Sequence, residues 1–312
     1  MKTIRDYKFV SPADKGASVA IGNFDGVHLG HMVVIERARE TATKFGVDSG
    51  VLTFEPHPRE LFQPDADPFR LMSSETRAHR LEKLGLDCLY EIGFTQGLAQ
   101  MTADEFAKEV ISEGLGLTHV VVGEDFRFGK GREGDAQMLE RLGMRYGFGV
   151  SIAELMHLDV GEVSSTAIRE ALSEGRTRDA AKMLGHWHRV DGPVIQGDQR
   201  GRDLGYPTIN MSIEGLHPPK FGVYAVQVDV LGGPHKGLYQ GAASIGVRPT
   251  FGINTPNIET YLFDFQGDLY GAEVSVALVR YLRSEEKFDN LEALISQMDS
   301  DVSAARKILA DL

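Results

Sequence analysis

One short segment joins the first apolar run of the chain to its first amphipathic stretch, and it reads Ile21-Gly22-Asn23-Phe24-Asp25-Gly26-Val27-His28-Leu29-Gly30-His31. The run before it, 18–21, predicts a buried strand, and the stretch after it, 29–45, predicts a helix. A strand that turns into a helix places free N–H groups at the helix N-terminus, where they favour phosphate. The segment therefore predicts an α/β domain with an anion site after its first strand.

Strand and helix patterns go on alternating to about residue 175. The expected strands lie at 50–54, 88–92, 119–122 and 149–153, and the expected helices at 73–84, 103–114 and 135–147. Near-continuous apolar strands separated by helices indicate a parallel sheet that is covered on both faces. The first part of the chain is therefore expected to be an α/β domain.

The pattern changes from about residue 188. Strand-like segments then follow one another at 222–230, 237–247, 258–265 and 273–282, with Gly, Pro and Asp turns between them. They indicate an antiparallel barrel or sandwich, followed by a helix from about Asp289. We place the boundary between Gly175 and His188, and we assign 1–186 and 187–312 to the two domains.

Composition limits the functional classes. The formal net charge of −12 argues against a nucleic-acid surface, which needs Lys and Arg to neutralise phosphates. Cys88 is the single cysteine, which excludes an intrachain disulfide and indicates a buried thiol in a reducing compartment. Neither a signal peptide nor a run of roughly 20 apolar residues is present, so we expect a cytoplasmic protein without membrane partners.

The two histidines of the opening segment are candidates for catalysis. His28 and His31 are three residues apart, so on a helix they share one face. Gly30 removes a side chain where a ligand could approach. Imidazoles at this position can donate hydrogen bonds to phosphates as charge develops in the transition state. The alternative is a pair of structural histidines beside a tight turn, and the preceding strand and turn favour function.

Three further segments fit the same pocket. Residues 53–58 and 123–129 follow predicted strands, where α/β sheets place ligand loops. Residues 164–169 open a helix and offer hydroxyls and an arginine to phosphate, although a plain Ser/Thr helix cap is the alternative. The aromatic side chains of Phe62, Phe126 and Phe128 can stack a flat ligand, although core packing is the commoner role for each taken singly.

A second candidate site lies in the glycine-rich stretch 197–210. It lacks the Gly-Lys-Ser/Thr ending of a P-loop, but spaced glycines still let backbone N–H groups surround a phosphate. Thr208 and Asn210 supply neutral oxygens of the kind that Mg²⁺ accepts. A long hairpin loop without a ligand is the alternative, and the residues alone leave both open.

Glu259 is a candidate general base. It shares one face of a predicted strand with Tyr261, Phe263 and Phe265, because side chains alternate along a strand. A carboxylate beside aromatic rings is partly desolvated, which favours a general base. The alternative is an edge-strand glutamate that points to water, the commoner fate of this residue.

Over nearly its whole length the chain resembles the bacterial bifunctional riboflavin kinase/FAD synthetases. Four motifs occur in order, Gly-x-Phe-Asp-Gly-x-His-x-Gly-His, Phe-x-Pro-His-Pro, Gly-x-Asp-Phe-Arg-Phe-Gly and Ser-Ser-Thr-x-Ile-Arg, and a Gly-x-x-Leu-Gly-x-Pro-Thr-x-Asn segment follows. The resemblance implies a Rossmann-like nucleotidyltransferase domain that transfers AMP from ATP to FMN, giving FAD. It also implies a Greek-key β-barrel with a closing helix that phosphorylates riboflavin with ATP and Mg²⁺, giving FMN.

The resemblance also assigns roles to residues. In the first domain, it implies that His28 and His31 are catalytic, that ATP is bound by Gly22, Asn23, Phe24, Asp25, Gly30, Ser164, Thr166 and Arg169, and that the flavin nucleotide is bound by Pro56, Pro58, Phe62, Asp125 and Phe128. In the second, it implies that ATP is bound by Gly201, Gly205 and Pro207, Mg²⁺ by Thr208 and Asn210, and the flavin by Arg283, Glu286 and Phe288, with Glu259 as the base.

Two positions depart from the family pattern. Ile209 replaces the usual alanine and Ser244 the usual asparagine, changes that bear on kinase efficiency.

Two other functions are alternatives. A nucleotidyltransferase with another acceptor and a regulatory barrel is disfavoured, because Thr208, Asn210 and Glu259 are all present. An RNA-binding barrel fused to a synthetase-like domain would need a basic, aromatic-lined face. The sequence leaves the oligomeric state open, a transient homo-oligomer included.

Overall fold

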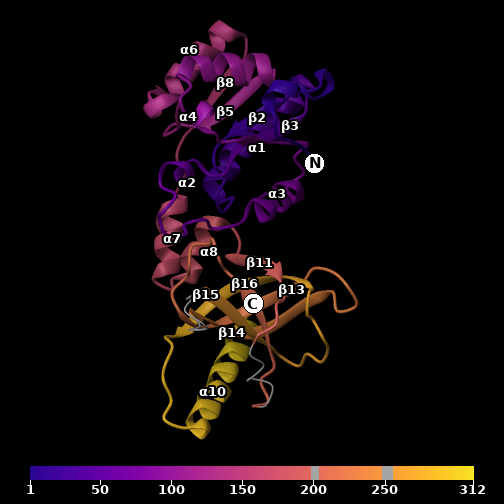
Figure 1. Cartoon of the computed structure of the whole chain (residues 1–312), viewed down its shortest axis with the longest axis vertical. Helices are drawn as coiled ribbons and strands as arrows, with labels where there is room; N and C mark the ends of the chain where they lie inside the picture. The colour runs from indigo at the N-terminus through magenta and orange to yellow at the C-terminus, as the bar shows by residue number, and fades with distance from the viewer. Residues whose placement is uncertain (198–203, 248–255) are drawn as a thin grey trace. The chain divides into compact units, whose positions relative to one another are not determined.

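The computed structural model describes residues 1–197, 204–247 and 256–312. These residues form two compact units, Met1–Asp67 with Ser73–Ser164 and Pro68–Met72 with Ser165–Leu312 (Figure 1). Each unit has a sheet and a hydrophobic core of its own.

The first unit is built on a parallel six-stranded sheet in the order β1-β4-β3-β2-β5-β8. Chain order reverses at β2, since β3 and β4 follow on one side of it and β5 and β8 on the other. Ligands of such sheets bind at the carboxyl ends of the strands where the order reverses. The strands are β1 Lys2–Ile4, β2 Ser18–Ile21, β3 Ser49–Glu55, β4 Cys88–Gly93, β5 His119–Gly123 and β8 Gly149–Ala153.

Helices cover this sheet, and all four residues of β2 are buried, as expected for a central parallel strand. The helices are α1 Leu29–Phe45, α2 Pro58–Phe62, α3 Ser74–Lys83, α4 Gln96–Ala99, α5 Ala103–Glu105, the π-helix η3 Phe106–Gly114 and α6 Ala136–Tyr146. Short 3₁₀ turns are η1 Tyr7–Phe9, η2 Pro12–Asp14 and η4 Lys130–Arg132, and two small hairpins pair β6 Arg127–Phe128 with β7 Gly134–Asp135 and β9 His157–Leu158 with β10 Gly161–Glu162. The predicted α/β domain is confirmed.

The described part of the second unit contains an antiparallel six-stranded sheet in the order β11-β16-β13-β14-β15-β12. The backbone N–H of Ile195 donates to the carbonyl oxygen of Asn210 at 2.8 Å and joins the two ends, so the sheet is a nearly closed barrel. Because β12 lies beside β15 of the β13-β14-β15 meander, the topology is a Greek key, as predicted. The strands are β11 Arg189–Pro193, β12 Thr208–Ser212, β13 Gly222–Val230, β14 Gly237–Val247, β15 Pro256–Leu262 and β16 Glu273–Arg283.

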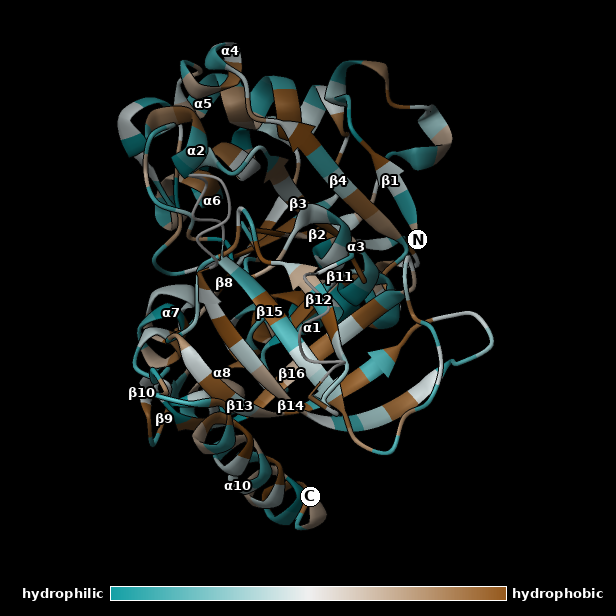
Figure 2. Ribbon diagram, turned by 60° about the horizontal axis from the view of Figure 1, so that its bottom comes forward, coloured by the Kyte–Doolittle hydropathy of each residue, from teal (hydrophilic) through white to brown (hydrophobic). Residues whose placement is uncertain are grey.

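Side chains of the barrel strands form two layers. Ile245 and Ile258 lie in the interior core, so their neighbours Ser244 and Glu259 point outward, because side chains alternate along a strand. Figure 2 shows this alternation as changing colours along the strands. Helix α10, Leu291–Ala310, packs on the outer face and confirms the expected closing helix.

Two helices before the expected domain boundary pack with the barrel unit. They are α7 Ser165–Ser173 and α8 Thr177–Leu184. The buried hydroxyl of Thr177 donates to the carbonyl oxygen of Val279 at 2.9 Å, and the N–H of Lys220 donates to the carbonyl of Leu172 at 2.9 Å. Packing of this kind does not show where independent folding begins, so the boundary at residues 186 and 187 stays a prediction.

Two fragments would locate that boundary. A fragment of residues 187–312 should fold and have the predicted kinase activity, whereas one of residues 165–312 should be more stable, because it keeps α8 and the Thr177 hydrogen bond. Burial of even one or two apolar side chains of α8 stabilises by about 1.5–3 kcal/mol each, which is worth roughly 5 °C or more in Tm. Thermal unfolding followed by circular dichroism measures the difference, and equal Tm values would contradict a stabilising role for α8.

Candidate active sites

The loop after β2 has a fixed and unusual backbone. Phe24 and Val27 have positive φ angles of 51° and 43°, although neither is glycine. Both side chains are fully buried, with no exposed surface. Non-glycine residues in this region cost of order 1–3 kcal/mol and persist where the surroundings hold them, commonly at functional sites. The core under Phe24 and Val27 therefore fixes the path of the predicted ATP loop.

His28 and His31 are brought together at the start of α1. His28 is the N-cap and not a helical residue, so the two rings meet by capping and not by a shared helix face. The N–H of His31 donates to Nδ1 of His28, and the N–H of His28 donates to Nδ1 of His31, each at 3.3 Å. The rings stack with centroids 3.6 Å apart. A neutral imidazole that accepts at Nδ1 carries its proton on Nε2, so this geometry makes each Nε2–H a donor.

Burial keeps the second ring neutral. Desolvation, and then the neighbouring His28, lower the pKa of His31 well below its ordinary value of 6.5. Gly30 permits this packing: a Cβ there would lie 3.1 Å from both His28 Nδ1 and the carbonyl oxygen of Val163. Glycine at this position therefore fits a close contact within the protein, and the approach of a ligand to Gly30 stays a prediction.

A buried charged network hydrogen-bonds to the backbone of the loop after β2. Arg77 on α3 is only 3% exposed and donates to the carbonyl oxygen of Asn23 at 3.4 Å. Its Nη2 also lies 3.0 Å from Glu55 and 3.2 Å from Glu91. Thr53 donates to the same Asn23 carbonyl at 3.2 Å. Sequence reasoning missed this network, for which a glutamate inside the apolar run 88–92 was the available signal.

Replacing Arg77 by methionine should impair FAD formation selectively. It removes a donor from the Asn23 carbonyl and leaves the buried Glu91 without this partner, which is strongly destabilising in general. Misplacement of catalytic groups by about 1 Å can cost 10²-fold, so we expect a loss of FMN adenylylation between about tenfold and 10²-fold. Arg77→Lys, which keeps the charge, should lose less. Both half-reactions are measured on the same chain, and a parallel loss of riboflavin phosphorylation would contradict a local effect.

The predicted flavin-nucleotide residues fall into two groups. Pro56 and Pro58 follow β3, and Phe62 on α2 is 61% exposed. Asp125 is also exposed. Phe128 is instead 8% exposed and belongs to the hydrophobic core, which is the alternative left open for it. Its contact with a flavin stays a prediction, as do those of the other four.

The predicted triphosphate residues lie at the start of α7. Nη2 of Arg169 donates to the hydroxyl of Thr166 at 3.2 Å, so these two are brought together. The guanidinium of Arg169 also lies over the ring of Phe69, 5.8 Å from its centroid. Their role toward ATP stays a prediction.

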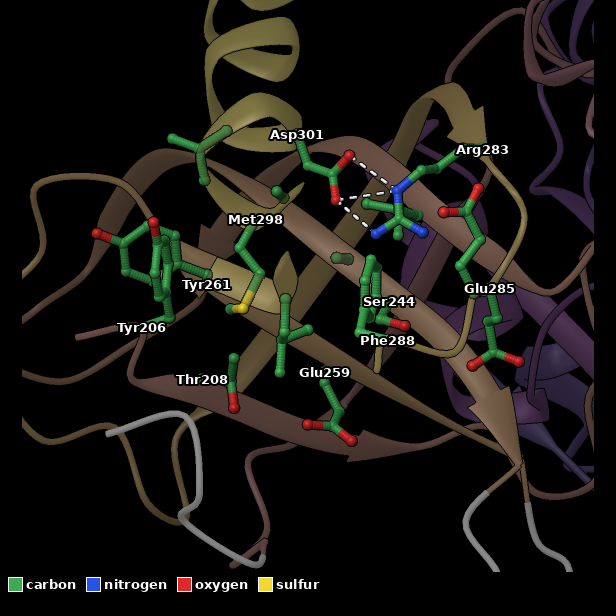
Figure 3. Close-up of a pocket in the computed structure, with 16 residues that line it drawn as sticks. Tyr206, Thr208, Ser244, Glu259, Tyr261, Arg283, Glu285, Phe288, Met298 and Asp301 are labelled. Carbon is green, nitrogen blue, oxygen red and sulfur yellow. Dashed lines mark hydrogen bonds and ion pairs between the residues drawn. The ribbon is translucent and has the colours of Figure 1, made fainter. Parts of the chain in front are cut away.

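The second candidate site is a cavity of about 290 Å³ between the outer face of the barrel and α10 (Figure 3). Glu259 on β15 is paired directly with Asn210 on β12 and with Ser244 on β14. Directly paired residues point to the same face, so these three side chains form one row across the sheet. The predicted residues that line the cavity are Thr208, Glu259, Arg283, Glu286 and Phe288.

Helix α10 holds two segments of the cavity wall. Nε of Arg283 donates to Oδ1 of Asp301 at 2.9 Å, and Nη2 donates to Oδ2 at 2.7 Å. This hydrogen bonding raises the pKa of Arg283 above its ordinary value. On the other side, the hydroxyl of Tyr206 donates to Asp299, which raises the pKa of the phenol to about 12. Neither aspartate could be linked to the site from sequence, because both lie far along the chain from their partners.

The predicted nucleotide loop is described in part. Gly201 lies outside the described residues. Gly205 has a φ of +85°, which suits glycine, and it and Pro207 are exposed. Asn210 is 5% exposed, and a Cβ at Gly197 would clash with its side-chain amide nitrogen, so Gly197 makes room for the Asn210 side chain.

The donor set around Thr208 and Asn210 fits magnesium. Both residues lie on one face of β12, beside Glu259 and Tyr261 of the paired strand. Within the described ranges, His, Cys, Asp and Glu form no cluster of three that could hold a metal. Mg²⁺ is usually bound by one or two protein oxygens together with waters and substrate phosphates, so it does not need such a cluster.

Comparisons with known proteins agree with this architecture. Family models match for FAD synthetase over residues 10–167 and for riboflavin kinase over residues 184–309. A bifunctional riboflavin kinase/FMN adenylyltransferase of Pseudomonas fluorescens is 40% identical over 99% of this chain and 98% of that protein. The Escherichia coli (strain K12) protein of the same description is 37% identical, with 98% and 97% covered.

A solved structure has the same fold. It is described as a macrolide-efflux protein from Streptococcus pneumoniae, with a TM-score of 0.85, 30% identity, and coverage of 97% of this chain and 98% of that one. In the part of our chain that the structure describes, no helix has the length and apolar character needed to span a membrane.

Proposed function

Because the chain belongs to the family of bifunctional riboflavin kinase/FMN adenylyltransferases, we propose that the His28–His31 pair serves FMN adenylylation and that the cavity around Glu259 serves riboflavin phosphorylation. The enzyme uses ATP to convert riboflavin to FMN and FMN to FAD. The cavity lined by Thr208, Ser244 and Glu259, with Asn210 paired to Glu259 on the neighbouring strand, supports the assignment of the kinase site.

In FMN adenylylation, a phosphate oxygen of FMN attacks the α-phosphorus of ATP. The bond to the bridging oxygen breaks, and pyrophosphate leaves. The Nε2–H groups of His28 and His31 donate to the phosphate oxygens as their charge grows, which is where such donors lower the barrier most. Ser164, Thr166 and Arg169 bind the triphosphate. The FMN phosphate is already anionic, so this site needs no general base.

In riboflavin phosphorylation, Glu259 accepts the proton of the terminal ribityl hydroxyl while that oxygen attacks the γ-phosphorus, and ADP leaves. Asn210 and Ser244 flank Glu259 on the two neighbouring strands. Thr208 and Asn210 would hold Mg²⁺. When bound, this ion would neutralise charge on the ATP phosphates.

Several further assignments belong to the same proposal. Residues 1–186 form the adenylyltransferase domain and residues 187–312 the kinase domain. Riboflavin, FMN and ATP are the partners, and nucleic acid and membranes are not. A cytoplasmic location accords with the single cysteine, which is buried.

One assay tests the proposed function. The protein is incubated with riboflavin, ATP and Mg²⁺, and the flavins are separated by chromatography. FMN followed by FAD is expected, and EDTA should stop both steps. If FMN forms without FAD, the proposed adenylylation site is contradicted. If neither FMN nor FAD forms, both proposed sites are contradicted.

A further inference from the structure

Asp301 and Arg283 form the most tightly bonded charged pair of the cavity wall. Three donor–acceptor distances between 2.7 and 3.1 Å join the guanidinium to the carboxylate (Figure 3). Asp301 is 8% exposed, and Gln297 donates to its Oδ1 at 2.9 Å. A bidentate pair of this kind fixes the plane of the guanidinium as well as its position.

We propose that Asp301 is a positioning residue of the kinase site, which aims Arg283 at the flavin ring of riboflavin. The inference rests on the proposed function of this cavity. Asp301 touches no reacting atom and acts through Arg283.

The hydrogen bonds of Arg283 show what is left for a ligand. Its five N–H groups include two that donate to Asp301 and one that donates to the carbonyl of Ser284 at 2.9 Å. The other two N–H groups have no hydrogen-bond partner among the described residues, and the guanidinium lies at the cavity wall beside Phe288, whose ring centroid is 5.8 Å from the guanidinium carbon. Donors next to an aromatic ring suit a flat heterocycle with carbonyl oxygens, which is the chemistry of the flavin ring.

Charge indicates which end of the substrate Arg283 takes. Asp301 neutralises the guanidinium, and Glu285 and Glu286 make the lining beside Arg283 acidic. This part of the wall disfavours a phosphate and accepts the uncharged ring of riboflavin. The hydroxyl chain of the substrate is then left to extend toward Glu259.

A second pair provides a matched control. Arg306 of α10 donates to both oxygens of Asp264 at 2.7 and 2.8 Å, which also ties the helix to the barrel. Neither residue lines the cavity. The two possible roles of Asp301 can therefore be distinguished. If Asp301 only ties α10 to the barrel, loss of either pair should have the same effect; if it positions Arg283 for the flavin, only loss of the pair in the cavity wall should weaken riboflavin binding.

The test measures riboflavin affinity by quenching of flavin fluorescence on the full-length protein without ATP. Asp301→Asn should raise Kd about tenfold, because one charge-assisted pair is lost, with kcat changed less than about twofold. Arg283→Met should weaken binding at least as much, and Asp301→Asn should add nothing in that background. Additive losses, or an unchanged Kd in Asp301→Asn, would overturn the proposal.

Asp264→Asn serves as the control for stability. It should leave riboflavin affinity unchanged, whatever its effect on Tm, and an equal loss of affinity would reduce Asp301 to a tether. If Asp301→Asn does not fold, Arg283→Lys replaces it: it keeps the charge but cannot form the bidentate pair, and an unchanged Kd would again overturn the inference. If the wild type binds riboflavin and these variants bind it equally well, only this inference is contradicted. If the wild type does not bind riboflavin, the proposed kinase site itself is contradicted.

Discussion

Glu259→Gln is expected to lower the kcat of riboflavin phosphorylation by about 10²–10⁴-fold. The ribityl hydroxyl is neutral and a poor nucleophile, so this half-reaction needs a base that the amide cannot provide. Glutamine keeps the shape of the side chain in its row between Asn210 and Ser244. Riboflavin affinity should change little, because a transition-state interaction is removed.

Kinase kcat on a variant whose fold is checked by circular dichroism decides this prediction. FMN added from outside should still become FAD, which gives an internal control in the same chain. Asn210→Asp is a useful contrast, because a charge beside the proposed Mg²⁺ should alter metal and ATP dependence instead. A folded Glu259→Gln protein with more than about a tenth of wild-type kcat would make Glu259 an ordinary strand glutamate.

Replacing either histidine of the pair should lower FAD formation by roughly 10²–10³-fold, the usual cost of losing one donor to developing charge. His28→Ala should also destabilise the protein by about 1 kcal/mol, because His28 caps α1. His31→Ala removes the hydrogen bond from the His28 N–H to Nδ1 of His31, and it should likewise lower both FAD formation and stability.

His28→Asn separates capping from catalysis. Asparagine is a strong N-cap, so this variant should keep the stability of α1 while losing the Nε2–H donor. Steady-state rates of FMN adenylylation and of riboflavin phosphorylation are compared for His28→Ala, His28→Asn and wild type. Recovery of adenylylation in His28→Asn would show that the ring serves the helix and not the phosphates.

Elements with a strong local pattern were predictable from sequence. Helix α1 and strand β14 have the expected bounds, because a regular apolar period runs through both and Gly46 ends the helix with a φ of +67°. Strand β15 was predicted to reach residue 265 but ends at Leu262, since Asp264 turns the chain with a φ of +58°. Consequently Phe265 does not continue the outward row of Glu259 and packs against the interior core instead.

Contacts between distant segments were not predictable. Arg77 reaches Asn23 and Glu91 only because the sheet brings their strands together. Asp301 reaches Arg283 only because α10 lies on the barrel. No local period or spacing encodes such pairs. Strand β1 was also missed, because three residues with a lysine and a threonine carry too little apolar pattern.

The row formed by Asn210, Glu259 and Ser244 limits how the length of this enzyme's sequence can vary. Because side chains alternate, loss or gain of a single residue within β15 would turn Glu259 into the barrel interior and Ile258 or Thr260 toward the cavity. Length changes are therefore tolerable within this strand only in pairs, or outside its bounds Pro256–Leu262. Lineages and engineered libraries of this enzyme should accordingly vary in loop length, while the number of residues in β15 changes only by an even number. An odd change would move the Glu259 carboxylate from the cavity into the apolar barrel interior.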